Sequence, residues 1–175
     1  EFLHRGADFS PQAGGGLGAG LRECACLALE GGAGFGFAGF QRGGFMEAQW
    51  LLPHAGYAEF VGSLAGEVAR QRPRISLIAS KLFDGQAQGF SFDGKGIALA
   101  IQLPQPKARV QAAFIAALTE LALLHGGRPN LIKDSSLQAE AAQRGIAEFA
   151  ACRTRLRAFD PQQLHASMLT RRLGL

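Results

Sequence analysis

Two stretches of the chain alternate between apolar and other residues, as strands do when one face lies on a core. They are residues 46–52, which Pro53 ends, and residues 97–103, which Pro104 ends. A third stretch, 75–83, is rich in apolar and β-branched residues and is also predicted as a strand. In the two alternating strands the predicted inward positions are Met46, Ala48, Trp50, Leu52, Ile97, Leu99, Ile101 and Leu103.

Elsewhere the apolar residues recur at helical spacings of three and four. Helices are predicted over 55–71, over 107–125, and over 137–159 with a break at Gly145. A short strand is predicted over 128–133 and a short terminal helix over 168–173. The apolar stripes of the three longer helices are Val61, Leu64 and Val68; Val110, Phe114, Leu118, Leu121 and Leu124; and Ile146, Phe149, Cys152 and Leu156.

The predicted order is strand, helix, strand, strand, helix, strand, followed by helices. This order is typical of an α+β, ferredoxin-like β-α-β-β-α-β fold, in which two helices cover one face of an antiparallel sheet. The other face is left to meet a ligand or another domain. Alternation places small and polar side chains there, namely Glu47, Gln49, Ala98, Ala100 and Gln102.

The composition changes near residue 44. Residues 1–44 hold more than half of the chain's 24 glycines, and glycine raises the entropic cost of ordering the backbone. This segment is predicted to be a linker or an irregular, poorly ordered stretch. A phosphate-binding loop is the alternative, but such a loop needs a preceding strand, and no strand is predicted before Gly14. The folded domain is expected to span residues 45–175.

Charge and cysteine content exclude several classes of protein. The net charge is +4 and the isoelectric point about 9.4, with arginines concentrated in the last third on helical spacing, which predicts a solvated helix face. Nucleic acid is not an expected partner, because basic and aromatic residues do not cluster on one strand. Three cysteines form neither a disulfide framework nor a zinc pattern, so no metal site is expected. With no secretion signal and no membrane-spanning run, a cytoplasmic location is expected.

Three stretches resemble one family of enzymes. They are GFMEAQWLLP at 44–53, GGRPNLIKDS at 126–135, and FDP at 159–161 followed by ASMLTRRLGL at 166–175. In order and spacing they are similar to the C-terminal half of decaprenylphosphoryl-ribose oxidase-like enzymes. Those enzymes belong to the vanillyl-alcohol-oxidase class of FAD-linked oxidases. The likeness runs from about residue 43 to the end of the chain.

The resemblance implies a two-domain enzyme in which a separate N-terminal domain binds most of the FAD. The domain present here would close over the flavin and hold a sugar, a sugar lactone or a polyprenyl-phosphate-linked pentose. Lys133 matches a lysine beside flavin and substrate, where a cation can stabilise negative charge. Gln49 and Lys81 match pocket residues, Glu47 stands where close relatives carry glutamine, and Asn130 stands at a flavin-contacting position.

Each of these residues also has a plain structural interpretation. Lys133 and Lys81 could be solvated strand ends, and Glu47 and Gln49 could be polar residues on an edge strand. A stand-alone ferredoxin-like ligand-binding or dimerisation module without catalysis is therefore the alternative function. If the family interpretation holds, we expect the chain alone to retain little FAD and to show no turnover. Membrane association of the whole enzyme is left open, since nothing in the sequence indicates it.

Overall fold

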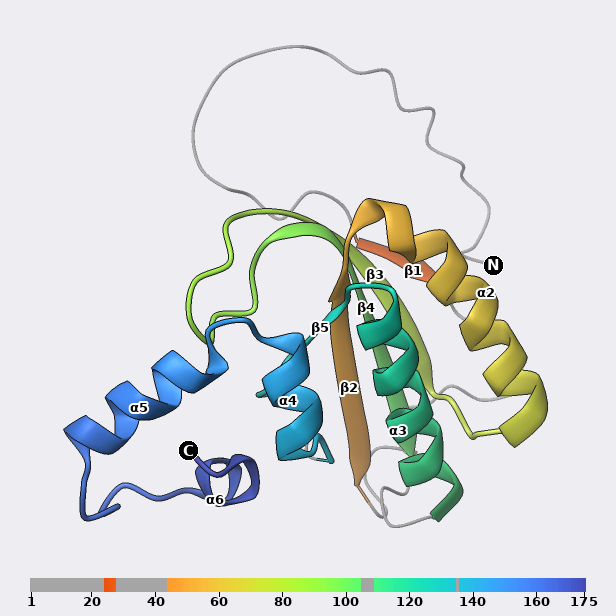
Figure 1. Cartoon of the computed structure of the whole chain (residues 1–175). Helices are drawn as coiled ribbons and strands as arrows, with labels where there is room; N and C mark the ends of the chain where they lie inside the picture. The colour runs from red at the N-terminus through yellow and green to blue at the C-terminus, as the bar shows by residue number, and fades with distance from the viewer. Residues whose placement is uncertain (1–23, 28–43, 105–108, 135) are drawn as a thin grey trace.

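An antiparallel sheet forms the centre of the fold (Figure 1). The computed structural model describes residues 24–27, 44–104, 109–134 and 136–175. The strands are β1 (Cys24–Leu27), β2 (Phe45–Leu52), β3 (Leu77–Asp84), β4 (Lys95–Pro104) and β5 (Arg128–Pro129). The helices are α2 (His54–Gln71), α3 (Arg109–Leu124), α4 (Ala139–Gly145), α5 (Phe149–Phe159) and α6 (Met168–Leu173). The strand order across the sheet is β1-β3-β4-β2-β5.

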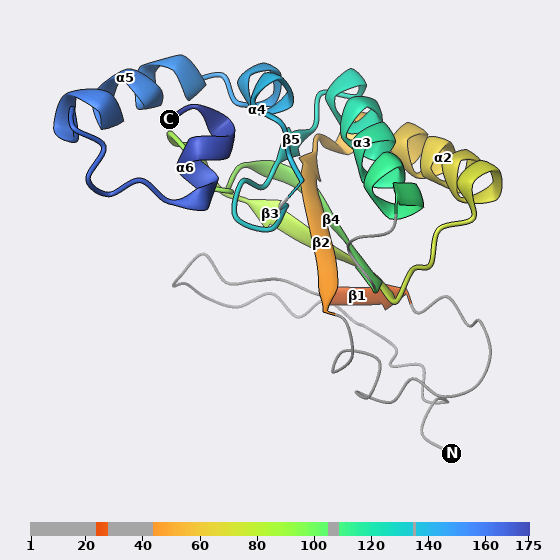
Figure 2. The same cartoon turned by 90° about the horizontal axis from the view of Figure 1, so that it is seen from below.

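The predicted α+β class and ferredoxin-like arrangement are confirmed. Strand β4 lies between β2 and β3 and runs antiparallel to both, so β2, α2 and β3 form a split β-α-β unit. Helices α2 and α3 lie together on one side of the sheet, while α4, α5 and α6 lie beyond the β5 edge (Figures 1 and 2). No helix among the described residues covers the other face of the sheet.

Strand β1 was not predicted. It pairs antiparallel with β3, with Cys24 opposite Lys81, and it extends the sheet at the edge away from β5. Its four residues are too few for a periodic pattern to stand out from the surrounding glycines. The remainder of the predicted linker, 1–23 and 28–43, lies outside the described residues.

The main core lies between the sheet and the helix pair α2 and α3. The predicted inward positions of β2 and β4 all belong to it except Ile97, which is half-buried near the start of β4. Trp50 is fully buried, packs against Phe60 of α2, and donates from Nε1 to Thr119 Oγ1 of α3 at 3.2 Å. Because a buried indole N–H needs an acceptor, this contact fixes the position of α3 over β2.

The predicted helix stripes are partly wrong. Of the predicted α2 stripe, Leu64 is buried and Val68 packs against the core, but Val61 is 38% exposed and its neighbour Phe60 is fully buried in its place. Val110 and Leu124, in the first and last turns of α3, are exposed, and so is Leu156 of α5. Helix periodicity locates a stripe, but it does not show how far the sheet beneath the helix extends.

The predicted strand over 128–133 is much shorter than expected. Only Arg128 and Pro129 pair with β2, and the chain then turns. Asn130 Oδ1 accepts a hydrogen bond from the backbone N–H of Ile132 at 3.1 Å, a local bond that favours a turn over a strand. Lys133 therefore lies in a turn rather than at a strand end, and Asp134 forms a single parallel bridge to Glu47.

Gly96 provides a test of the β2–β4 pairing. It has a φ of +155°, and an added Cβ would lie 2.1 Å from the backbone oxygen of Leu52. We expect Gly96→Ala to lower the free energy of unfolding by about 2–4 kcal/mol, because the backbone of β2 or β4 would have to move to make room for the added Cβ. Gly62→Ala in α2 is the control, because its Cβ meets no atom within 4 Å. There the same change should stabilise by up to about 1 kcal/mol. Urea denaturation measures both, and equal effects would contradict the expectation.

Candidate functional site

The helix-free face of β2 carries an ion pair. Lys133 Nζ lies 3.1 Å from Glu47 Oε1. The other carboxylate oxygen, Oε2, accepts a hydrogen bond from Gln102 Nε2 of β4 at 3.1 Å. The side chain of Glu47 is 13% exposed and that of Lys133 is 49% exposed. The carboxylate is thus fixed against the sheet, while the ammonium group remains accessible to a ligand.

Two buried amide side chains lie beside this pair. Asn130 Nδ2 donates to Gln49 Oε1 at 2.8 Å, and the backbone N–H of Asn130 donates to the backbone oxygen of Gln49 at 2.9 Å. Gln49 Nε2 makes no hydrogen bond to any residue that the structure describes. We refer to Glu47, Gln49, Gln102, Asn130 and Lys133 as the polar cluster. It combines four of the five site residues predicted from the sequence with Gln102.

Lys81, the fifth predicted residue, lies apart from the cluster. It pairs with Ala98, which in turn pairs with Leu51, so all three lie on the helix-free face. Two strand spacings, about 10 Å, separate β3 from β2. Ala98 of β4 and Leu51 of β2, which follow Lys81 across the sheet, are both buried, so this part of the face is already covered. Lys81 could meet only a ligand that extends well beyond the cluster.

Asp134 is a residue that the sequence analysis missed. It is 1% exposed, and its Oδ1 accepts hydrogen bonds from the backbone N–H and the hydroxyl of Ser136 at 2.8 and 2.7 Å. Its Oδ2 has no hydrogen-bond partner among the described residues. Burial raises the pKa of this carboxyl, and the Ser136 hydrogen bonds and the charge of Arg172 oppose that shift only in part. In the sequence Asp134 is a single aspartate next to Lys133, and nothing in that pattern indicated that its side chain is buried.

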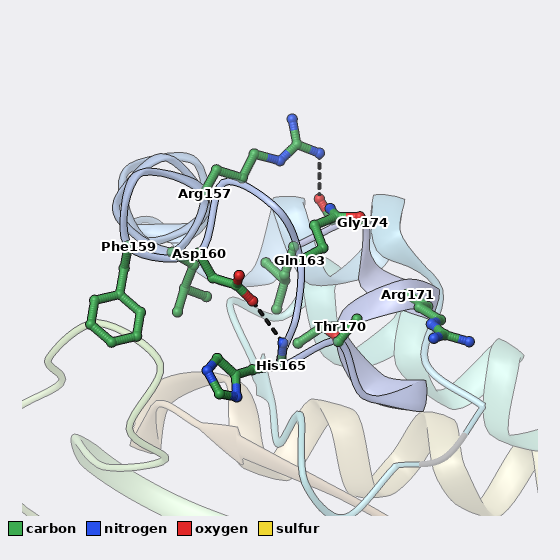
Figure 3. Close-up of a pocket in the computed structure, with 11 residues that line it drawn as sticks. Arg157, Phe159, Asp160, Gln163, His165, Thr170, Arg171 and Gly174 are labelled. Atoms are coloured by element: carbon green, nitrogen blue, oxygen red, sulfur yellow. Dashed lines mark hydrogen bonds between the residues drawn. The ribbon is translucent and has the colours of Figure 1, made fainter.

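A cavity of about 370 Å³ lies between α5 and α6 (Figure 3). Arg157 donates to the backbone oxygen of Gly174 at 3.0 Å, and Arg171 lies at the opposite side of the view. The Asp160 carboxylate accepts from the backbone N–H groups of Leu164 and His165 at 2.9 and 2.8 Å. The aspartate of the FDP motif therefore closes a turn, and the arginines do not converge on one point.

Comparison with known proteins identifies no family: no family model matches the chain, and no curated protein matches it significantly.

Three further observations concern the described residues only. They contain no group of three or more histidine, cysteine, aspartate or glutamate side chains arranged to hold a metal ion. None of their helices is both long and apolar enough to cross a bilayer. Cys152 is a free, buried thiol.

The raised pKa of Asp134 predicts how stability changes with pH. A carboxyl whose pKa is raised by folding binds its proton more tightly in the native state, so the native state loses stability as pH rises above about 4. In urea denaturation between about pH 4 and 7, wild type should therefore lose stability relative to Asp134→Asn. Asp160→Asn tests the opposite case at lower pH. Hydrogen bonds from the backbone N–H groups of His165 and Leu164 lower the pKa of Asp160, so wild type should lose stability relative to Asp160→Asn as pH falls below about 4. Parallel curves for wild type and Asp134→Asn would contradict this account.

Proposed function

We propose that this chain is the substrate-side domain of an FAD-dependent oxidoreductase of the vanillyl-alcohol-oxidase class, similar to decaprenylphosphoryl-ribose oxidase-like enzymes. Its reaction would oxidise an alcohol carbon of a sugar, a sugar lactone or a polyprenyl-phosphate-linked pentose. One observation carries the proposal. Gln49 and Asn130 belong to two of the motif stretches and are 81 positions apart in the sequence, yet their side chains form a hydrogen bond. They meet on the one large face of the sheet that none of the described helices covers.

The cluster suits the edge of a flavin ring and a hydroxylated substrate. The half-exposed Lys133 ammonium can donate to an electronegative ring atom or to a substrate oxygen, and its charge would stabilise negative charge that develops there. When bound, the flavin would supply the hydride acceptor. The described residues contain no glycine-rich pyrophosphate loop between a strand and a helix, so a neighbouring domain would hold most of the FAD.

The other cluster residues would orient the substrate. Gln49 Nε2 is a donor with no bond to the described residues, and Gln49 is held in place by Asn130. The Glu47 carboxylate can accept a hydrogen bond from a substrate hydroxyl. Asn130 holds the Gln49 side chain in place. In the enzymes that the chain resembles, an aromatic residue at this position contacts the flavin, and that contact would be absent here.

A first test concerns the cofactor. If another domain supplies most of the flavin contacts, the purified chain should be colourless, and equilibrium dialysis against micromolar FAD should show no stoichiometric uptake. The same chain joined in frame to its FAD-binding domain should be yellow. Stoichiometric flavin on the chain alone would contradict the division of roles proposed here.

A second test concerns Lys133 in the full-length protein. Lys133→Met should lower kcat by about 10²–10³-fold, the size expected when one group that stabilises developing charge is removed. Bound flavin should stay unchanged. Lys95→Met is the matched control, because Lys95 pairs with the exposed Asp84 at 3.8 Å near the far end of β4. Undiminished turnover in Lys133→Met, with flavin bound, would rule out the flavin-side role.

The alternative, a stand-alone binding or dimerisation module, has one observation in its favour. Several large apolar side chains of the C-terminal part are exposed, namely Phe159, Leu164 and Met168. Exposed apolar groups can mark a protein interface. A reading frame with no FAD-binding domain beside this chain, together with self-association in sedimentation experiments, would favour the module over the enzyme.

A further inference from the structure

We propose that Glu47 makes the polar cluster selective for a neutral, hydroxyl-bearing ligand and prevents a phosphate group from binding at Lys133. This inference rests on the proposed function for the role of the site, and it narrows the substrate class to an uncharged polyol or sugar at the reacting end. It depends on the carboxylate of Glu47, which contacts both Lys133 and Gln102.

The first argument is charge. With Glu47 Oε1 only 3.1 Å from Lys133 Nζ, the pair has no net charge. An anion that approaches the ammonium also approaches the carboxylate, so attraction and repulsion largely cancel. A lysine without such a partner would instead act as a phosphate-binding point charge.

The second argument is that the carboxylate cannot easily move aside. Glu47 lies on β2, a strand paired on both sides, and its sequence neighbours Met46 and Ala48 are buried in the core. Gln102 Nε2 holds the second carboxylate oxygen at 3.1 Å. An anion that binds Lys133 would therefore have to displace the 3.1 Å ion pair and would still face a carboxylate that Gln102 holds in place. A built-in repulsive group of this kind is a common source of specificity.

The third argument is the mixture of donors and acceptors. Gln49 Nε2 and the remaining N–H groups of Lys133 donate, while Glu47 and Gln102 Oε1 accept. A hydroxyl group both donates and accepts, so neighbouring hydroxyls of a polyol can satisfy both kinds of group. A phosphate oxygen at neutral pH mainly accepts and would leave the acceptors of the cluster opposed to it.

The test measures binding of inorganic phosphate to the chain by nuclear magnetic resonance, following the backbone amides of Asn130, Lys133 and Asp134. In wild type, tens of millimolar phosphate should leave these signals unmoved. In Glu47→Gln, which keeps the shape and can still bond Gln102, phosphate should bind about tenfold more tightly, because the repelling charge is gone. The double variant Glu47→Gln, Lys133→Met should lose this gain in phosphate affinity, which would show that the phosphate binds at Lys133.

Asp84→Asn is the matched control. It removes the same charge from another carboxylate–lysine pair, Asp84 and Lys95, whose side chains are both exposed. It should produce no binding at the cluster signals. If Asp84→Asn increased the phosphate affinity as much as Glu47→Gln does, the change in net charge alone would explain the effect, and the inference would be overturned. Phosphate-induced shifts at Lys133 in the wild type would overturn it even if Glu47→Gln failed to fold.

This experiment measures phosphate binding at the polar cluster and requires neither flavin nor turnover, so its result is independent of the cofactor test. If the chain excludes phosphate but no FAD-binding domain accompanies it, the oxidase proposal would be refuted, while the proposed exclusion of phosphate by Glu47 would stand. In the full-length enzyme, the ratio of kcat/KM for a free sugar alcohol to that for its phosphate monoester should fall about tenfold in Glu47→Gln. An unchanged ratio would overturn the inference while leaving the oxidase proposal intact.

Discussion

The double hydrogen bond between Gln49 and Asn130 is the contact on which the polar cluster depends. Backbone N–H to backbone oxygen at 2.9 Å and side-chain amide to side-chain amide at 2.8 Å join the turn after β5 to the middle of β2. Both residues are buried, so each amide would be costly to leave without a partner. Because the turn is fixed at Asn130, its next residues run back along β2 and bring Lys133 to Glu47.

The C-terminal helix supports the same turn from another direction. Arg172 of α6 donates to the backbone oxygen of Asp134 at 2.9 Å, and Ser136 holds the Asp134 side chain. Leu173 of α6 packs in a second core with Leu131 and Leu137. The three motif stretches are therefore one physical unit: the first supplies the strand, the second the turn, and the third the helix that holds the turn.

Burial strengthens the ion pair of the polar cluster and fixes its position. A carboxylate and an ammonium group fully exposed to water interact weakly, but the low exposure of Glu47 limits screening by solvent. The same desolvation raises the pKa of Asp134 one residue from Lys133. A ligand at this face would meet a fixed pattern of donors and acceptors, with no net charge on the central pair of Glu47 and Lys133. That pattern is better suited to hydroxyl groups than to anions.

The sequence by itself determined the order of the elements from β2 onward, the inward face of β2 and β4, and the polar character of the opposite face, because alternation of apolar residues sets which face meets a core. It also singled out Glu47, Gln49, Asn130 and Lys133 through their motifs. Only the tertiary structure decided that the segment after Pro129 is a turn, that Lys81 lies two strands away, and that Asp134 is buried. The position of the turn and the burial of Asp134 depend on contacts between residues about 40 to 80 positions apart, and a local pattern carries no record of such partners. The turn also depends on the local hydrogen bond between Asn130 and Ile132, which the apolar pattern does not reveal.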